Sequence, residues 1–164
     1  MPHTPLQASP RFRGSSKNGI YGDAIQEIDW STGAILAELE RLKISRRTLV
    51  VFLSDNGPEN NPRRPLDWGT GSNGPFRGWK NSSLEGGMRV PCVMYWPGRL
   101  PGNVVCDEIS TTLDILPTIA HLAEIDMPDD RIIDGGNLSP LLLGESKARS
   151  PHYAFYYYLS LIHI

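Results

Sequence analysis

The clearest pattern along the chain is a stripe of mostly apolar positions between residues 22 and 43. Side chains that recur every three or four positions form one face of an amphipathic helix. The stripe consists of Ile25, Ile28, Thr32, Ile35, Leu36, Leu39 and Leu42. Arg41 and Lys43 lie in the last turn, where cations suit the helix dipole. A similar stripe predicts a second helix over residues 111–125, with Pro117 in its first half, where backbone donors are still unpaired.

Two apolar runs rich in β-branched residues predict strands at residues 48–54 and 89–96. The first run follows the first helix almost directly, and a helix leading into such a strand is half of an α/β unit. Both faces of this strand are apolar, which predicts a buried, central place in a sheet. Cys92 lies in the second run and is expected to be a small buried residue.

Composition limits the classes of partner. The chain has 164 residues, of which 40% are apolar and 21% charged, as expected for a globular protein with one core. The net charge of −2 offers no basic surface to nucleic acid or anionic lipid. No apolar run approaches the roughly 20 residues of a membrane span, and no signal peptide is evident. We expect Cys92 and Cys106, the two cysteines, to be free thiols.

Candidate chemistry begins where the first strand ends, at Ser54-Asp55-Asn56-Gly57. In open α/β sheets, ligands bind beyond the carboxyl ends of the strands. Asp55 and Asn56 offer two hard oxygen ligands, which suit Ca²⁺ or Mg²⁺. Lys80, beyond a Gly-, Pro- and Asn-rich loop at residues 58–79, is a cation suited to an anionic substrate. Because D-N-G is also a common turn, the spacing alone favours a simple turn.

Several motifs taken together favour a functional site over a simple turn. The strings are S-D-N-G, G-S-N-G-P-F-R-G-W-K ending at Lys80, and E-G-G-M-R-V-P at residues 85–91. H-T-P at His3 precedes them, and D-G-G-N-L-S-P-L-L at residues 134–142 follows. In this order they resemble the sulfatase family over residues 2–158. The loop is most similar to that of N-acetylgalactosamine-6-sulfatases, although Gly-Trp stands before Lys80 where that branch has Cys-Gly.

The resemblance implies an α/β fold of the alkaline-phosphatase-like sulfatase type. The part present would be a mainly parallel sheet flanked by helices. Residues 1–150 would form the C-terminal half of the catalytic domain. Residues 151–164 would begin a small C-terminal subdomain, with a strand over 152–158 and a last stretch that matches nothing expected there.

The resemblance also implies a chemistry, the hydrolysis of sulfate esters of sugars or aryl alcohols. A formylglycine made from Cys or Ser in C/S-x-P-x-R would attack sulfur beside a Ca²⁺ or Mg²⁺ ion. Asp55 and Asn56 would ligate this metal, and Lys80 and His3 would be catalytic residues that contact the sulfate and assist proton transfer. Glu85 and Arg89 would form a structural, partly buried pair.

Two parts of such a site are not found in the sequence. Neither cysteine stands in C-x-P-x-R, and no Asp-Asp pair follows a first apolar strand. We therefore expect the chain alone to be inactive. Two alternatives stay open: a phosphodiesterase or phosphonate hydrolase of the same superfamily, and a non-catalytic relative that binds sulfated glycans. The E-G-G-x-R-x-P string favours sulfatases. The family implies a sulfated small molecule or glycan as partner, a lysosomal, secreted or periplasmic location, and allows a homodimer.

Overall fold

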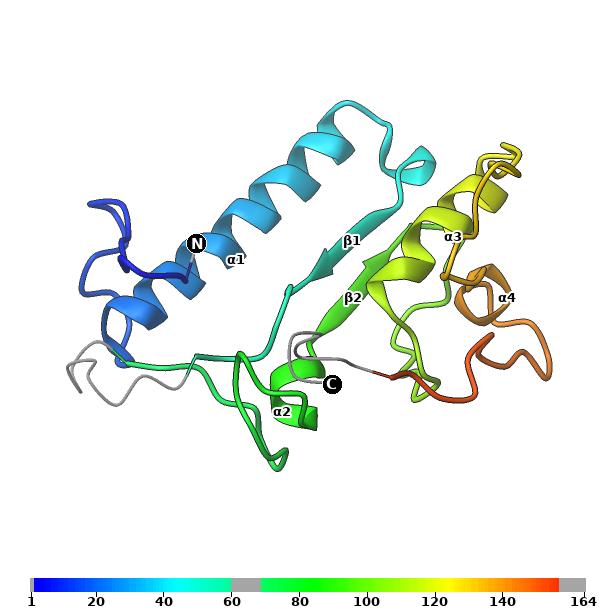
Figure 1. Cartoon of the computed structure of the whole chain (residues 1–164). Helices are drawn as coiled ribbons and strands as arrows, with labels where there is room; N and C mark the ends of the chain where they lie inside the picture. Colours follow the sequence, from blue (N-terminus) through cyan, green and yellow to red (C-terminus); the bar gives the residue numbers. More distant parts are fainter. Residues whose placement is uncertain (1, 60–68, 157–164) are drawn as a thin grey trace. The chain divides into compact units, whose positions relative to one another are not determined.

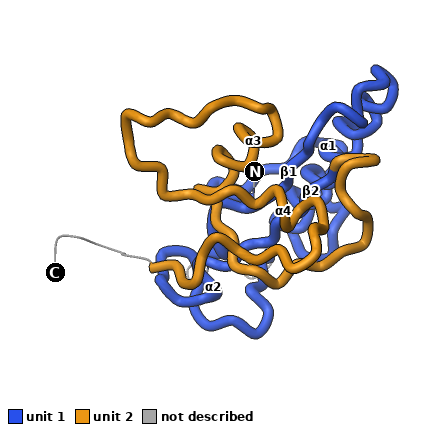
Figure 2. The backbone as a smooth tube through the Cα atoms, turned by 90° about the vertical axis from the view of Figure 1, so that its right-hand side faces the viewer, with its two compact units in different colours: residues 1–95, 158–164 blue, residues 96–157 orange. Residues whose placement is uncertain are grey.

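The chain forms two compact units in a computed structural model that describes residues 2–59 and 69–156 (Figure 2). Residues 2–59 and 69–95 belong to the first unit, and residues 96–156 to the second. None of the helices among these described residues is long and apolar enough to cross a bilayer.

Unit 1 contains the longest helix, α1, at Gly19–Arg41 (Figure 1). This confirms the helix predicted over residues 22–43. Its first turns are joined to the preceding loop by the buried carboxylate of Asp23, which accepts hydrogen bonds from the Gly14 and Ser16 N–H groups, each at 2.8 Å. These bonds lower the pKa of Asp23, and the bond from the Ser16 N–H has the larger effect.

The two predicted strands form, but they are shorter than predicted and antiparallel. A 3₁₀ turn, η1, at Ser45–Arg47 leads into β1 at Val50–Leu53, which pairs with β2 at Cys92–Tyr95. The expectation of a mainly parallel sheet is wrong for this pair. A parallel pair needs a crossover that returns the chain to the starting end of the first strand. Here the chain leaves β1, reverses once and enters β2 from the same end.

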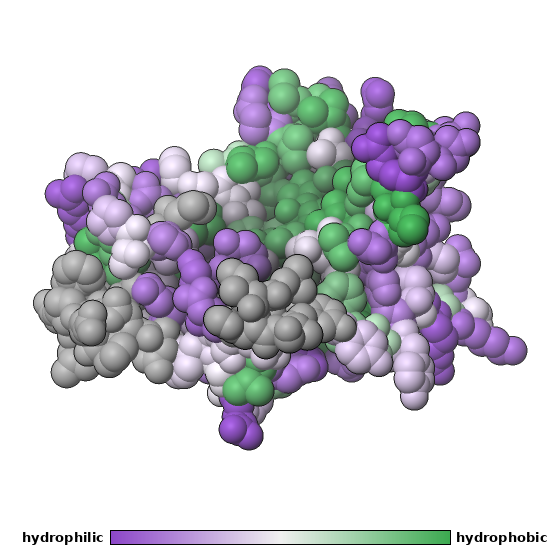
Figure 3. Space-filling view, in the orientation of Figure 1, coloured by the Kyte–Doolittle hydropathy of each residue, from purple (hydrophilic) through white to green (hydrophobic). Residues whose placement is uncertain are grey.

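One face of the β1–β2 pair is apolar and exposed, so the prediction of a strand buried on both faces is wrong for the described residues. Phe52 lies opposite Val93 in the register and Val50 opposite Tyr95. Phe52, Val93 and Tyr95 are 41%, 60% and 44% exposed, and Figure 3 shows apolar side chains gathered over this region. Cys92, expected to be buried, is exposed as well, although alternation along the strand puts it on the opposite face from Val93.

Unit 2 is built around the second predicted helix. A 3₁₀ turn, η3, at Thr112–Asp114 leads into α3 at Ile115–Leu122, so this helix is confirmed but shorter. Thr111 and Asp114 form a capping box at its start. Pro117 is the third residue of α3, where no helical N–H partner is required, as predicted.

Residues 134–142 pack on this start. They end in a short helix, α4, at Ser139–Leu142, and the Leu138 N–H donates to the Thr118 hydroxyl at 2.9 Å. The Gly136 N–H donates to the Asp114 carboxylate at 2.8 Å. This segment therefore has a structural role in unit 2, because it is hydrogen-bonded to the start of α3.

The strand expected over residues 152–158 is not present in its described part, residues 152–156. Residues 157 and 158 lie outside the described residues. Side chains hold the preceding segment instead: Glu108 accepts from the Ser150 N–H at 2.9 Å, and His152 Nε2 lies 2.5 Å from Asp114.

Candidate functional site

The D-N-G turn presents its polar atoms at the end of β1. The Ser54 hydroxyl donates to the Asn56 carbonyl at 2.9 Å, and Asn56 Nδ2 donates to the Gly57 carbonyl at 2.9 Å. The second bond orients the amide so that its Oδ1 remains as the acceptor of the side chain. Asp55 is exposed beside it. Asp55 and Asn56, each with a side-chain oxygen that could ligate a metal, therefore follow β1 almost directly.

The Glu-Gly-Gly segment packs against this turn through its backbone. It forms the short helix α2 at Glu85–Met88, and the Gly57 N–H donates to the Gly87 carbonyl at 2.9 Å. A Cβ added to Gly57 would lie 1.9 Å from the Gly86 carbonyl oxygen, so only glycine fits. Close backbone approach at the two glycines of this motif was predicted and is confirmed.

Lys80 is joined to the same turn. Its N–H donates to the Pro58 carbonyl at 2.9 Å. The loop before it is held by the Gly86 N–H, which donates to the Arg77 carbonyl at 2.7 Å, and by a hydrogen bond from the Asn73 amide to the Gly78 carbonyl. The structure thus brings the segments of Lys80 and of the D-N-G turn together, as the sequence-based site requires.

Glu85 and Arg89 form the predicted ion pair, but it is exposed rather than partly buried. Arg89 Nε lies 2.5 Å from Glu85 Oε2, and both side chains are more than half exposed. The Arg89 guanidinium also lies over the Phe76 ring, 4.7 Å from its centroid. The pair spans i and i+4 of the surface of α2, so its contribution to stability is about 0–1 kcal/mol.

His3 lies apart from these contacts. Its Nδ1 donates at 3.0 Å to the Thr4 carbonyl, which belongs to the cis Thr4-Pro5 peptide bond, and the ring is exposed. A proton on Nδ1 leaves Nε2 with the lone pair in the neutral imidazole. Among the described residues, no hydrogen bond or ion pair joins His3 to Asp55 or Lys80.

Asp55 and Asn56 fit a hard divalent cation as part of a shell. Ca²⁺ takes about six to eight oxygen ligands, and these two residues supply neighbouring carboxylate and amide oxygens. In the described part of the chain, no three His, Cys, Asp or Glu side chains are grouped so as to hold a metal. The remaining ligands would therefore come from elsewhere.

Sequence reasoning missed two residues that shape the site. Pro58 supplies the carbonyl that receives the Lys80 N–H, and Asn73 fastens the loop before the lysine. The only available signal was an Asn between glycines in G-S-N-G, a position where a side-chain amide commonly bonds nearby backbone. Part of the predicted loop, residues 60–68, lies outside the described residues.

The motifs and their order are those of the sulfatase family, and comparison with known proteins agrees. The family model for sulfatases matches residues 1–125, and the chain belongs to this family. It is 45% identical over 157 residues to the steryl-sulfatase of Mus musculus, covering 94% of this chain and 25% of that protein. It is 43% identical to the N-acetylgalactosamine-6-sulfatase of Canis lupus familiaris, covering 94% of this chain and 29% of the relative.

Solved structures confirm the sulfatase fold. Ps i-CgsB in complex with k-i-k-neocarrahexaose matches with a TM-score of 0.77 and 30% identity, over 92% of this chain and 33% of that one. PsFucS1 sulfatase from Pseudoalteromonas sp. matches with a TM-score of 0.77 and 31% identity, over 86% and 28%. The chain thus spans about a quarter to a third of the length of these relatives.

Proposed function

We propose that this chain is the part of a sulfuric ester hydrolase that forms one wall of its active site. The observation that carries the proposal is the set of backbone hydrogen bonds between the D-N-G turn and its two neighbours. Gly57 bonds Gly87, and Lys80 bonds Pro58. These bonds join the backbone of the D-N-G turn to the segments of Gly87 and Lys80, which supports a site in which the metal ligands and the lysine act on one sulfate.

Within this wall, the side chains have distinct roles. Asp55 and Asn56 would hold a Ca²⁺ or Mg²⁺ ion, which when bound supplies a Lewis acid beside the sulfate oxygens. The Lys80 ammonium would hold a sulfate oxygen and offset charge on the leaving oxygen. Because backbone bonds already position the Lys80 segment, less freedom is lost when the anion binds.

His3 would contact the sulfate from another side. The bond from Nδ1 to the Thr4 carbonyl orients the ring and leaves Nε2 to accept or, once protonated, to donate a proton. This is the role of a general acid or base toward the leaving oxygen.

The proposed substrate is a sulfate ester of a sugar or an aryl alcohol. Relatives named steryl-sulfatase and N-acetylgalactosamine-6-sulfatase support the reaction class, and the neighbour solved in complex with k-i-k-neocarrahexaose supports a sugar. Residues 1–150 are proposed as the C-terminal half of the catalytic domain. The formylglycine nucleophile would lie in a segment that the 164 residues do not contain, since C/S-x-P-x-R is absent from them.

One sequence determination tests this proposal. The reading frame upstream of Met1 in the genome is expected to encode C/S-x-P-x-R. A Thr or Ser nucleophile without that motif would identify a phosphohydrolase instead. The absence of both would identify a non-catalytic binding protein.

An assay of the purified chain is the second test. We expect no turnover of an aryl sulfate such as p-nitrocatechol sulfate in the presence of Ca²⁺, because the nucleophile is missing. Measurable turnover that persists when the 164-residue chain is purified to homogeneity would contradict this expectation.

A further inference from the structure

Three asparagines of the chain are followed directly by glycine, at Asn18-Gly19, Asn56-Gly57 and Asn73-Gly74. In such a pair the glycine nitrogen can attack the side-chain amide carbon of the asparagine, because glycine has no side chain to obstruct the approach. The reaction is favoured where the glycine N–H is free of hydrogen bonds and where water reaches the asparagine. The three pairs differ in both respects.

The Gly19 N–H lacks a hydrogen bond among the described residues. Gly19 is the first residue of α1, a position whose N–H has no partner within a helix, and no acceptor for it is found in residues 2–59 and 69–156. By contrast, the Gly57 N–H donates to the Gly87 carbonyl at 2.9 Å. The Gly74 N–H donates to the Ser72 hydroxyl at 3.1 Å. An N–H that is already bonded must break that bond before it can react, which slows the step.

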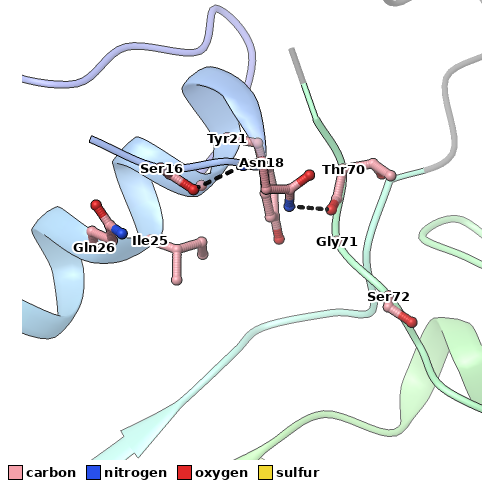
Figure 4. A pocket seen from close by; sticks show the side chains of 9 residues that line it. Ser16, Asn18, Tyr21, Ile25, Gln26, Thr70, Gly71 and Ser72 are labelled. Atoms are coloured by element: carbon pink, nitrogen blue, oxygen red, sulfur yellow. Dashed lines mark hydrogen bonds between the residues drawn. The ribbon is translucent and has the colours of Figure 1, made fainter. Parts of the chain in front are cut away.

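Asn18 is also the most accessible of the three asparagines. It is exposed and lines the cleft between the start of α1 and residues 70–72, whereas Asn56 and Asn73 are half-buried (Figure 4). Its Nδ2 donates to the Thr70 carbonyl at 3.0 Å, a bond that Figure 4 shows as a dashed line. This bond joins the start of α1 to the loop that leads to Lys80, so a reaction at the amide would act on both.

We propose that Asn18-Gly19 is a site of spontaneous deamidation, and that the reaction releases residues 70–72 from α1. The Gly19 nitrogen gives up its proton and bonds to Asn18 Cγ, while the Cγ–Nδ2 bond breaks and the amide leaves as ammonia. The succinimide that results takes up one water molecule. Opening at Cγ gives aspartate at this position, and opening at the backbone carbonyl gives isoaspartate.

The product cannot keep the contact with Thr70. A carboxylate has acceptor oxygens and no N–H to donate, so it would meet the Thr70 carbonyl as one acceptor against another. The start of α1 offers a better partner, because its N–H groups lack helical acceptors and carry partial positive charge. Asn18 is the N-cap residue and makes no side-chain cap bond in this structure. Deamidation therefore replaces a bond to the loop with a cap on the helix.

Incubation of the folded 164-residue chain in ¹⁸O-water at mildly alkaline pH tests the site. Digestion with trypsin in ordinary water, followed by mass spectrometry, reports the label at each asparagine. We expect Asn18 to react first, with Asn56 and Asn73 each about fivefold slower, the effect of one hydrogen bond that must break. The same incubation in urea is the control, since the three pairs should react at similar rates without the fold. Equal rates in the folded chain, or a slower reaction at Asn18, would overturn the proposal.

A charge variant tests the release of the loop. Asn18→Asp reproduces the aspartate product, and the amides of residues 69–72 should lose part of their ¹H–¹⁵N heteronuclear NOE as local motion increases. Asn103→Asp adds the same charge at an exposed asparagine of unit 2 and should leave these amides unchanged. The amide signals of α1 report whether each variant is folded. If Asn18→Asp leaves the NOE of residues 69–72 at the value of the unmodified chain, the proposed release is wrong.

Discussion

The most constrained side chain of unit 2 is Asp114, which is 0% exposed. Its carboxylate accepts N–H bonds from Thr111 at 2.7 Å and from Gly136 at 2.8 Å, and His152 Nε2 lies 2.5 Å away. Three segments that are far apart in sequence therefore meet on one anion. A buried charge of this kind is stable because both of its carboxylate oxygens accept hydrogen bonds.

Replacing this carboxylate should loosen the whole of unit 2. Asp114→Ala leaves two half-buried N–H groups without their acceptor, and we expect it to lower the local stability by about 3 kcal/mol. Hydrogen exchange of the α3 amides measures this directly. Asp126→Ala, at an exposed position, is the control and should change exchange little. Unchanged protection in Asp114→Ala would show that the three segments are held by other contacts.

The same residue predicts an acid-dependent stability. Burial raises the pKa of Asp114, but hydrogen bonds from Gly136, Thr111 and His152 outweigh it, and the pKa is lowered overall. A carboxyl with a lower pKa in the folded state stabilises the fold above its unfolded value of about 3.9. This contribution is lost as the pH falls through the folded pKa.

Urea unfolding between pH 7 and pH 3 tests this effect. The protein should lose stability over this range, and Asp114→Asn, which has no titrating carboxyl there, should lose less. Asp126→Asn is the matched control and should follow the unmodified chain. A steeper loss in Asp114→Asn would contradict the sign of the pKa change.

Residues with a motif could be predicted from the sequence, and residues with a purely tertiary role could not. Asp55, Asn56 and Lys80 stand in strings whose combination is specific, and the structure brings their segments together. Asp114 carries no such signal, because its partners come from 22 and 38 residues away. The site roles of Asp55, Asn56, Lys80 and His3 were all assigned by motif, and they stay predictions.

At the scale of elements, α2 is the part that positions the site. Its glycines lie against carbonyls of the lysine loop: a Cβ added to Gly87 would come within 2.3 Å of the Ser82 oxygen and 2.5 Å of the Trp79 oxygen. Since these are backbone atoms, they cannot move aside as a side chain would. The packing of α2 therefore sets where Lys80 lies.

Gly87→Ala should displace the lysine loop. The added methyl group meets two carbonyl oxygens, and overpacking of this kind costs about 1–3 kcal/mol. Limited proteolysis should show faster cleavage between Phe76 and Leu84. Gly102→Ala provides the control, because a Cβ there meets nothing within 4 Å. If the two variants are cleaved at the same rate as the unmodified chain, the close approach is not what holds the loop.

The elements themselves were predictable where local periodicity decides them. The stripe that predicts a helix over 22–43 corresponds to α1, and both apolar runs contain a strand. Strand direction and burial could not be predicted, because both depend on what the rest of the molecule places beside a strand. This explains the antiparallel β1–β2 pair and the exposed Cys92, where a parallel sheet and a buried thiol were expected.

At the scale of the whole molecule, the exposed face of β1–β2 is the feature that needs an explanation. An isolated two-stranded sheet is marginally stable in water, and a contiguous apolar surface is unusual on a monomer. The chain spans about a quarter to a third of its relatives, whose remaining length offers material to cover such a face. In the chain alone, this face should bind apolar dyes.

A pair of double variants tests this expectation. Phe52 and Val93 are cross-strand neighbours on the face, so Phe52→Thr with Val93→Thr keeps β-forming side chains and removes apolar area. Fluorescence of bound anilinonaphthalene sulfonate should fall about twofold. Val104→Thr with Val105→Thr changes two valines that are 65% and 84% exposed outside the sheet, and should change the signal little. The argument depends on contiguity rather than exposure, because single exposed apolar residues are normal on any protein surface. An equal fall in both double variants would mean that the dye reports scattered side chains and that the β1–β2 face is no special surface.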